Sequence, residues 1–184
     1  MNKFTLFLFI IGIVLVSGCT GSNSNTGDAM ENIVKEGDYV KVDYIGELKD
    51  GTIFDTSIKD AAVEGEVYNP NREYEPLGFT VGAGQMIAGF DKGVIGMAVG
   101  EEKTLTLTPE EAYGEYSEER IQTVSLEELE SVGIFPTVGD KLSTPQGFVT
   151  VVDVTDTEVK IDYNHELAGK TLIFKVTLVS IGQE

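Results

Sequence analysis

Alternation of hydrophobic and polar residues marks the first predicted strand of the chain. Over residues 39–48, Val40, Val42 and Tyr44 fall on one face, and charged side chains fall between them. Because successive side chains of a strand point to opposite faces, this pattern predicts a strand with one buried and one solvated face. The Asp-Gly dipeptide at residues 50–51 is typical of a hairpin turn, so a return strand is expected directly after it.

A helical repeat follows a long polar segment. Residues 56–76 are mostly polar and contain an Asn-Pro-Asn sequence, so we expect an extended surface loop, longer than most loops of compact domains. Hydrophobic residues then recur at about one helical turn and predict a helix over residues 85–97. Strands are expected on either side of this helix, at residues 79–81 and 101–108. Its apolar face would then form the floor of a pocket.

The next part of the chain predicts a small subdomain of its own. Residues 115–165 hold 11 acidic and 3 basic residues. A capping-box sequence at residues 125–128 predicts a short helix, and strands are expected near residues 141–143, 147–154 and 158–163. Their hydrophobic side chains could form a separate core, made of Val149, Val151, Val154, Val159 and Ile161.

The last predicted strand belongs with the first ones. Residues 171–181 alternate between hydrophobic and polar, but the small subdomain offers this strand no partner. We therefore expect the strand to rejoin the first sheet. The predicted larger domain consists of residues 36–114 and 166–184, and residues 115–165 are inserted into it.

The N-terminal residues predict a signal peptide and a lipid anchor. Residues 1–18 contain a lysine, then an uncharged apolar core that is shorter than the ~20 residues of a membrane-spanning helix, then small residues. The sequence up to Cys19 resembles the lipobox of prokaryotic lipoproteins, which implies cleavage before Cys19 and a lipid on its sulfur. An ordinary signal peptide with a chance cysteine is the alternative. Residues 19–35 predict a flexible linker, so we expect the folded part to lie outside the cytoplasm, anchored to the cell membrane.

Composition and charge exclude several classes of function. A hydrophobic content of 41% predicts a packed core, and a formal net charge of −18 argues against a nucleic-acid partner, which needs clustered Lys and Arg. The single cysteine excludes an internal disulfide. The glycines at residues 82–84 lack the third glycine of a dinucleotide-binding loop, and the acidic runs lack the spacing of a calcium loop. We therefore expect no cofactor and no metal.

Seven short motifs, taken in order, match one family. They are residues 42–44, 51–57, 81–82, 86–91, 96–101, 109–114 and 164–172. Their order and spacing resemble the FKBP-type peptidyl-prolyl cis-trans isomerases, and within them the SlyD-like group with an inserted chaperone domain. The resemblance covers about residues 36–184 and implies an α+β fold, with a bent antiparallel sheet wrapping a short helix and a small β-rich insert. The chain lacks the His- and Cys-rich tail of many SlyD proteins, so metal binding is not carried over.

The resemblance also implies a proline-binding pocket. Its catalytic positions fall on Asp55, Tyr113 and Tyr44, and its substrate-binding positions fall on Phe54, Leu77, Met86, Ile87, Phe90 and Phe174. Phe90 stands where the family often has Trp, and Leu77 replaces an aromatic residue. Because an X-Pro bond loses charge separation when it twists, an apolar pocket favours the twisted form over the planar one. Asp55 would orient Tyr44 or polarise the amide, while the Tyr113 hydroxyl and the Ile87 amide would hold substrate carbonyls.

We therefore expect a monomeric peptidyl-prolyl isomerase that acts on X-Pro bonds in unfolded or folding proteins. Exposed hydrophobic residues of the insert would add chaperone activity, and the candidates are Ile134, Phe135, Phe148 and Val149. The alternative is that these residues pack inside the insert. A second hypothesis for the whole chain is a catalytically weak lipoprotein binding module or holdase chaperone on the same fold. His165, the one histidine, is expected to be a loop residue at the exit of the insert.

Overall fold

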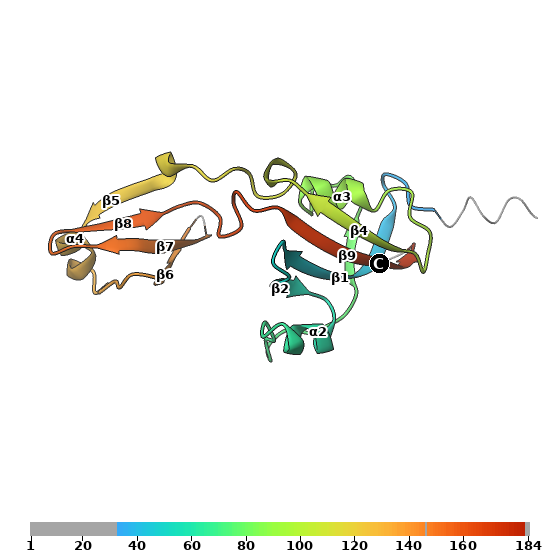
Figure 1. The fold of residues 1–184 in the computed structure, drawn as a ribbon, viewed down its shortest axis with the longest axis horizontal. Coiled ribbons are helices and arrows are strands. Elements are labelled where there is room, and N and C mark those ends of the chain that lie inside the picture. The colour runs from blue at the N-terminus through green and yellow to red at the C-terminus, as the bar shows by residue number, and fades with distance from the viewer. Residues whose placement is uncertain (1–32, 146, 183–184) are drawn as a thin grey trace, which may run out of the picture.

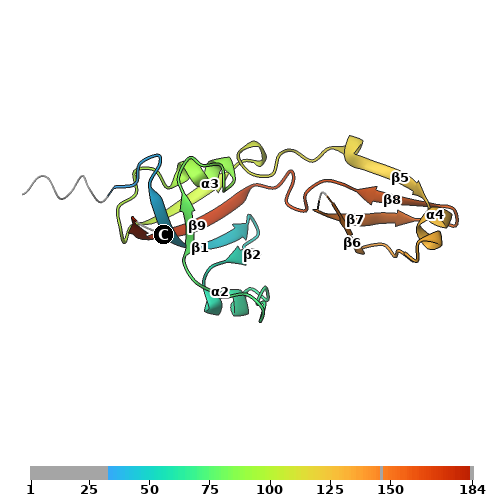
Figure 2. The ribbon, with the colours of Figure 1, turned by 180° about the vertical axis from the view of Figure 1, so that it is seen from behind.

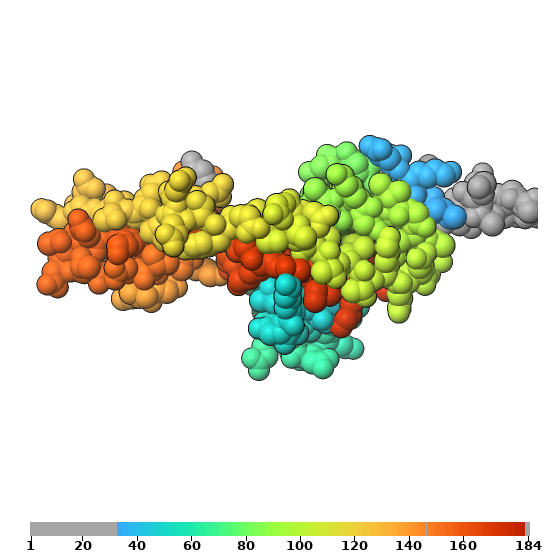
Figure 3. Space-filling view, turned by 45° about the horizontal axis from the view of Figure 1, so that its top comes forward, coloured from blue at the N-terminus to red at the C-terminus, as the bar shows by residue number. Residues whose placement is uncertain are grey.

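The computed structural model describes residues 33–145 and 147–182, which form an elongated molecule with two lobes (Figure 1). Seen from behind, the same two lobes are joined by two extended segments, residues 112–117 and 163–171 (Figure 2). We call these two segments the neck, and a space-filling view shows that it is narrower than the lobes (Figure 3). Within the described part of the chain, no helix is long and apolar enough to cross a membrane. The predicted signal peptide, Cys19 and linker residues 19–32 lie outside the described residues.

The larger lobe is built on a five-stranded antiparallel sheet. Its strands are β1 (Tyr39–Leu48), β2 (Ile53–Thr56), β3 (Leu77–Thr80), β4 (Glu102–Leu107) and β9 (Leu172–Ile181). The order is β2-β1-β9-β4, and β3 pairs with the first half of β1. β9 lies between β1 and β4 although it comes last in the chain. The sheet is therefore complete only after the chain has returned from the smaller lobe.

One face of this sheet carries the main hydrophobic core. Val40, Val42 and Tyr44 are buried, as the alternation predicts, and alternate residues of β9 between Leu172 and Leu178 join them. Helix α3 (Ala88–Gly93) lies over this face and packs Phe90 into the core (Figure 1). The predicted α+β fold, with an antiparallel sheet around a short helix, is confirmed.

Two glycines let α3 approach β4. A Cβ atom at Gly89 would lie 2.6 Å from Leu107, and one at Gly93 would lie 2.5 Å from Leu105. Both leucines are buried parts of the core, so they have little room to move. Glycine at these positions therefore sets the distance between the helix and the sheet.

The predicted helix over residues 85–97 is wrong in length. Residues 85–87 precede α3, and Ile87 is its N-cap residue with extended-type ψ of 143°. The chain leaves the helix after Gly93, and Gly96 adopts a left-handed conformation with φ of 84°. The hydrophobic spacing continues through these turns, because the side chains still face the same core, and this is why the spacing predicted too long a helix.

The segment 56–76 is not a plain extended loop. It contains helix α2 (Lys59–Glu64), which buries Ala61 and Ala62 and lies beyond β2 (Figure 1). This helix has only six residues and no side-chain cap. The sequence therefore lacks both the capping residue and the length of hydrophobic repeat that predict a helix. Near the start of the described residues, packing begins before the predicted domain boundary at residue 36, since Val34 is buried in the main core.

The smaller lobe contains a second, four-stranded antiparallel sheet. Its strands are β5 (Ile121–Ser125), β6 (Lys141–Thr144), β7 (Gly147–Val154) and β8 (Glu158–Asp162), in the order β5-β8-β7-β6, with α4 (Leu126–Ser131) after β5. The alternation did not predict β5. Val149, Val151, Val159 and Ile161 form a separate buried cluster, against which Val154 packs.

Capping differs from the prediction. Ser125 precedes α4, but its side chain makes no capping hydrogen bond. A capping box forms instead between Thr108 and Glu111, around the 3₁₀-helix η1 (Pro109–Glu111). A second 3₁₀-helix, η2 (Glu118–Arg120), leads into β5.

The two segments of the neck are hydrogen-bonded to each other. The buried side chain of Asn164 accepts from the Ser117 amide at 3.1 Å and donates to the Ser117 carbonyl at 2.8 Å. Closer to the larger lobe, the Gly169 amide donates to the Gly114 carbonyl at 2.9 Å. An ion pair between Lys141 of β6 and Glu166 adds a contact from the smaller sheet. The outgoing and returning segments are thus held side by side.

Candidate functional site

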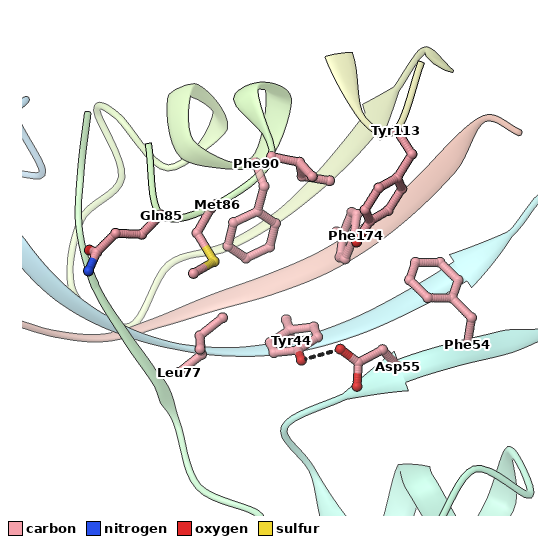
Figure 4. Close-up of a pocket in the computed structure, with 10 residues that line it drawn as sticks. Tyr44, Phe54, Asp55, Leu77, Gln85, Met86, Phe90, Tyr113 and Phe174 are labelled. Atoms are coloured by element: carbon pink, nitrogen blue, oxygen red, sulfur yellow. Dashed lines mark hydrogen bonds between the residues drawn. The ribbon is translucent and has the colours of Figure 1, made fainter. Parts of the chain in front are cut away.

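A cavity of about 490 Å³ opens beside α3, a size typical of small-ligand pockets. Its walls come from β1, β2, β3, β9, the start of α3 and the turn after η1 (Figure 4). The lining residues are Tyr44, Phe54, Asp55, Leu77, Gln85, Met86, Ile87, Phe90, Tyr113 and Phe174. The structure therefore brings all nine predicted site residues to one cavity, and it adds Gln85.

Strand register places the polar and aromatic residues together. Gly46 of β1 pairs with Asp55 on one side and with Phe174 on the other. A Cβ atom at Gly46 would lie 2.7 Å from the ring of Phe54 and 3.0 Å from that of Phe174. Glycine at this position leaves the space that the two rings occupy.

The floor of the cavity is a cluster of aromatic rings. Phe90 meets Phe174 edge to face with ring centroids 5.1 Å apart, and Tyr44 meets Phe90 in the same manner at 6.0 Å. Phe54 and Phe174 are perpendicular at 5.6 Å. Such pairs stabilise by about 0.5–1.5 kcal/mol each beyond the burial of their area. Because Phe90 is only 3% exposed, the floor is also part of the core and is held rigidly.

A polar group closes one side of the cavity. The Tyr44 hydroxyl donates to Asp55 Oδ2 at 2.6 Å (Figure 4). Arg72 donates to Asp55 Oδ1 at 2.5 Å through Nη1 and to the Tyr44 oxygen at 3.0 Å through Nη2. Burial and the bond to Asp55 raise the pKa of Tyr44 to about 12, although Arg72 opposes this. Tyr44 therefore remains protonated and keeps donating to Asp55.

Sequence reasoning missed Arg72. It lies in the segment between α2 and β3, where Tyr68 and Tyr74 stack with ring centroids 5.5 Å apart. The Arg72 guanidinium lies 5.5 Å from the ring centroid of Tyr74, and the Asn69 amide donates to the Tyr74 hydroxyl at 2.9 Å. Arg72 is one of two arginines in an acidic chain, and it lies in a long loop that follows Asp55. This position is the signal that could have indicated an ion pair with Asp55.

The opposite side of the cavity holds Tyr113, whose ring points toward Phe174 (Figure 4). Burial raises the pKa of Tyr113, and the nearby charges of Asp55 and Glu166 add to the effect. Gln85 Oε1 accepts from the Thr80 amide at 2.8 Å and so ties the segment before α3 to the end of β3.

The remaining lining side chains are apolar. Leu77, Met86 and Ile87 are half-buried and pack against the main core. In the described part of the chain, no group of three or more His, Cys, Asp or Glu side chains is placed to hold a metal ion. The cavity thus offers a rigid aromatic floor, apolar walls and hydroxyl groups on two sides, which suits a compact apolar ring attached to a polar backbone.

Comparisons with known proteins agree with this geometry. A family model described as FKBP-type peptidyl-prolyl cis-trans isomerase matches residues 31–179. A short-type peptidyl-prolyl cis-trans isomerase of Methanocaldococcus jannaschii is 48% identical over 147 residues, which cover 80% of this chain and 93% of that protein. The FKBP-type isomerase SlyD of Helicobacter pylori is 32% identical over 131 residues, or 70% of each chain. SlyD of Aeromonas hydrophila is 38% identical over 121 residues, covering 64% of this chain and 56% of that protein.

Replacing Arg72 by Ala should loosen the segment between α2 and β3 without unfolding the protein. Both partners of the Arg72–Asp55 pair are about 40% exposed, so the free energy of unfolding should fall by no more than about 1 kcal/mol. Amide hydrogen exchange over residues 69–74 should become faster, because Arg72 joins this segment to β1 and β2. Arg120→Ala, at the other arginine, is the control. Unchanged exchange at residues 69–74 would show that Arg72 does not fix the segment.

Proposed function

Because the chain belongs to the FKBP-type peptidyl-prolyl cis-trans isomerases, we propose that its aromatic cavity binds the proline ring of an X-Pro bond and lowers the barrier to rotation. The observation that supports this role of the site is the floor of Phe90, Phe174 and Phe54, which offers an apolar surface for a five-membered ring. The barrier of an ordinary peptide bond is ~18–20 kcal/mol and comes from amide resonance. A site that binds the twisted amide better than the planar one reduces it.

The floor suits this task because it has no charge. A planar amide carries more charge separation than a twisted one, so an apolar surface penalises the ground state more than the transition state. The carboxylate at the rim does not disturb this, since Tyr44 and Arg72 already bind both oxygens of Asp55. No nucleophile and no proton transfer are required.

The polar residues hold the substrate backbone. The Tyr113 hydroxyl and the Ile87 amide are proposed to donate to substrate carbonyls on either side of the proline. Asp55 is proposed to keep the Tyr44 hydroxyl turned away from the floor and to present an electronegative edge to the rotating carbonyl carbon. The hydrogen bond of 2.6 Å between Tyr44 and Asp55 supports the first of these two roles.

Substitution of the polar residues tests this mechanism. Asp55→Ala and Tyr113→Phe should each lower kcat/KM for a short proline peptide by about tenfold, which corresponds to ~1.4 kcal/mol of transition-state stabilisation. Isomerisation would be followed by NMR exchange between the cis and trans signals of the peptide. Asp156→Ala, in an exposed turn of the smaller lobe, is the control and should be without effect. Full activity in both Asp55→Ala and Tyr113→Phe would refute the proposed roles, and an inactive wild type would favour a binding module.

We further propose that the smaller lobe captures unfolded chains. Hydrophobic side chains gather in the segment after α4, where Val132, Phe135 and Val138 are 71%, 72% and 64% exposed. Phe148 on β7 is 73% exposed and lies on the face opposite to that of the small core. Large hydrophobic side chains that remain this exposed on a small lobe support a role in binding other chains. Of the four candidates from the sequence, Phe135 and Phe148 fit best, Ile134 is partly covered at 37% exposure, and Val149 packs inside the lobe.

The capture surface can be separated from the cavity by mutation. The double variant Phe135→Ser, Phe148→Ser should bind an unfolded protein at least about tenfold more weakly, because burying one Phe side chain contributes about 1.5–3 kcal/mol. Catalysis of proline-limited refolding should slow accordingly, while kcat/KM for a short peptide stays the same. Val99→Ser, at a side chain of the larger lobe with 47% exposure, is the control. Equal refolding rates in the double variant and the wild type would contradict a chaperone role for this surface.

The N-terminal motif supports a proposal about location. We propose that Cys19 carries a lipid that anchors the protein outside the cytoplasm, because small residues precede it and a polar segment follows it. Two lobes that work on unfolded chains would then act at the membrane surface.

Cys19→Ser tests the anchor directly. In a prokaryotic host that processes lipoproteins, the wild type should sediment with membranes, and metabolic labelling with a fatty acid should mark it. The Cys19→Ser variant should lose the label and leave the membrane pellet. A Ser17→Ala variant, which keeps a small residue before the cysteine, is the control. A wild-type protein without label would contradict the proposal.

A further inference from the structure

The ring of Tyr113 has a stacking partner from a distant part of the chain. Tyr113 and His165 lie parallel, with an angle of 3° between their planes and 3.8 Å between their centroids. Tyr113 belongs to the segment that leaves the larger lobe, and His165 belongs to the segment that returns to it. The stack therefore joins the two segments of the neck at a residue, Tyr113, that lines the cavity.

His165 is held firmly by the larger lobe. Its Nδ1 atom accepts from the Leu167 amide at 3.1 Å, and its carbonyl accepts from the Ala168 amide at 2.8 Å. Leu167 is buried in the main core, with 8% exposure. The imidazole is thus attached to the rigid part of the molecule through a short turn, although the ring itself lies near the surface.

The orientation of the Tyr113 ring depends on this contact, because the core packs Tyr113 less than it packs the aromatic residues of the floor. Its side chain is 38% exposed, whereas Tyr44, Phe90 and Phe174 are buried within the core. Its backbone is fixed by the bonds of Gly114, which donates to Pro109 at 2.7 Å and accepts from Gly169 at 2.9 Å. A fixed backbone does not by itself select the side-chain rotamer, and the imidazole covers one face of the Tyr113 ring and restricts its rotation there.

We propose that His165 is a positioning residue, which holds the Tyr113 ring by stacking so that the hydroxyl is directed at the substrate. This deepens the proposed function, because it rests on Tyr113 taking part in substrate binding. Loss of the stack should therefore reduce kcat/KM about two- to tenfold.

The imidazole performs this role in its neutral form. Nδ1 must carry a lone pair to accept the Leu167 hydrogen, and a proton there would face another N–H. Burial lowers the pKa of His165 below its ordinary value, and Glu166 opposes this. The other groups around the stack are the Tyr113 hydroxyl, Asp55, Lys141, which pairs with Glu166, and Lys170. Since the pKa is lowered, the stacked arrangement should persist well below neutral pH and fail only as the pH falls through that lowered value.

Three substitutions separate the stack from the turn. His165→Asn removes the ring but keeps an oxygen that can accept the amide two residues on, as Asn does in turns. His165→Phe keeps a ring and loses the acceptor, and His165→Ala loses both. We expect His165→Asn and His165→Ala to lower kcat/KM about two- to tenfold, and we expect His165→Phe to recover most of the activity. In acid, the activity of the wild type should fall while that of His165→Phe stays level.

NMR tests the stack independently of activity. The chain has one histidine, so its Hε1 signal is unambiguous. We expect an upfield shift from the Tyr113 ring current, a move downfield in Tyr113→Leu, and a perturbation when a proline peptide binds. A wild type that isomerises peptides while His165→Asn keeps full kcat/KM and a native spectrum would overturn the positioning role alone. An inactive wild type with an intact ring-current shift would instead count against the proposed function.

Discussion

The packing of Phe90 between the helix and the sheet is the constraint on which the rest of the structure depends. Its ring contacts Tyr44, Phe79 and Phe174, so that α3, β1, β3 and β9 meet at one side chain. The same ring edge forms the floor of the cavity. Core and site therefore share residues, and the packing that folds the larger lobe also gives the floor of the cavity its shape.

The position of β9 extends this dependence to the smaller lobe. Phe174 is needed for the floor and Leu172 and Leu178 for the core, yet all three follow the second sheet in the chain. The larger lobe is therefore completed by a strand that arrives through the neck. This explains why the neck is tied by specific hydrogen bonds, such as those of Asn164 with Ser117, and why its two segments meet beside Tyr113.

Strand alternation predicted the sheet and the second core, because these depend on local periodicity, and the resemblance of the motifs to a known family supplied nine of the ten residues of the cavity. The sequence did not predict α2, β5 or the true length of α3. Such elements are short, and their bounds are set by contacts with distant residues: Leu105 and Leu107 against the glycines of α3, and β8 against β5. Arg72 and His165 were missed as neighbours of the cavity for a related reason. Arg72 contacts Asp55, and His165 contacts Tyr113, from loop segments whose position in space the sequence pattern does not indicate.

The charges of the molecule are arranged so that the cavity stays apolar. The chain carries a formal net charge of −18, and a carboxylate at the rim would ordinarily add to a strong negative potential. Here one of its two arginines is placed on Asp55, and a tyrosine hydroxyl covers the other oxygen. In the proposed function, a substrate would therefore meet aromatic rings, the Tyr113 hydroxyl and a carboxylate whose charge is offset by Arg72, although the surface around them is acidic. The neck, where Tyr113 of the cavity stacks on His165, joins the lobe that holds this cavity to the lobe that exposes Phe135 and Phe148.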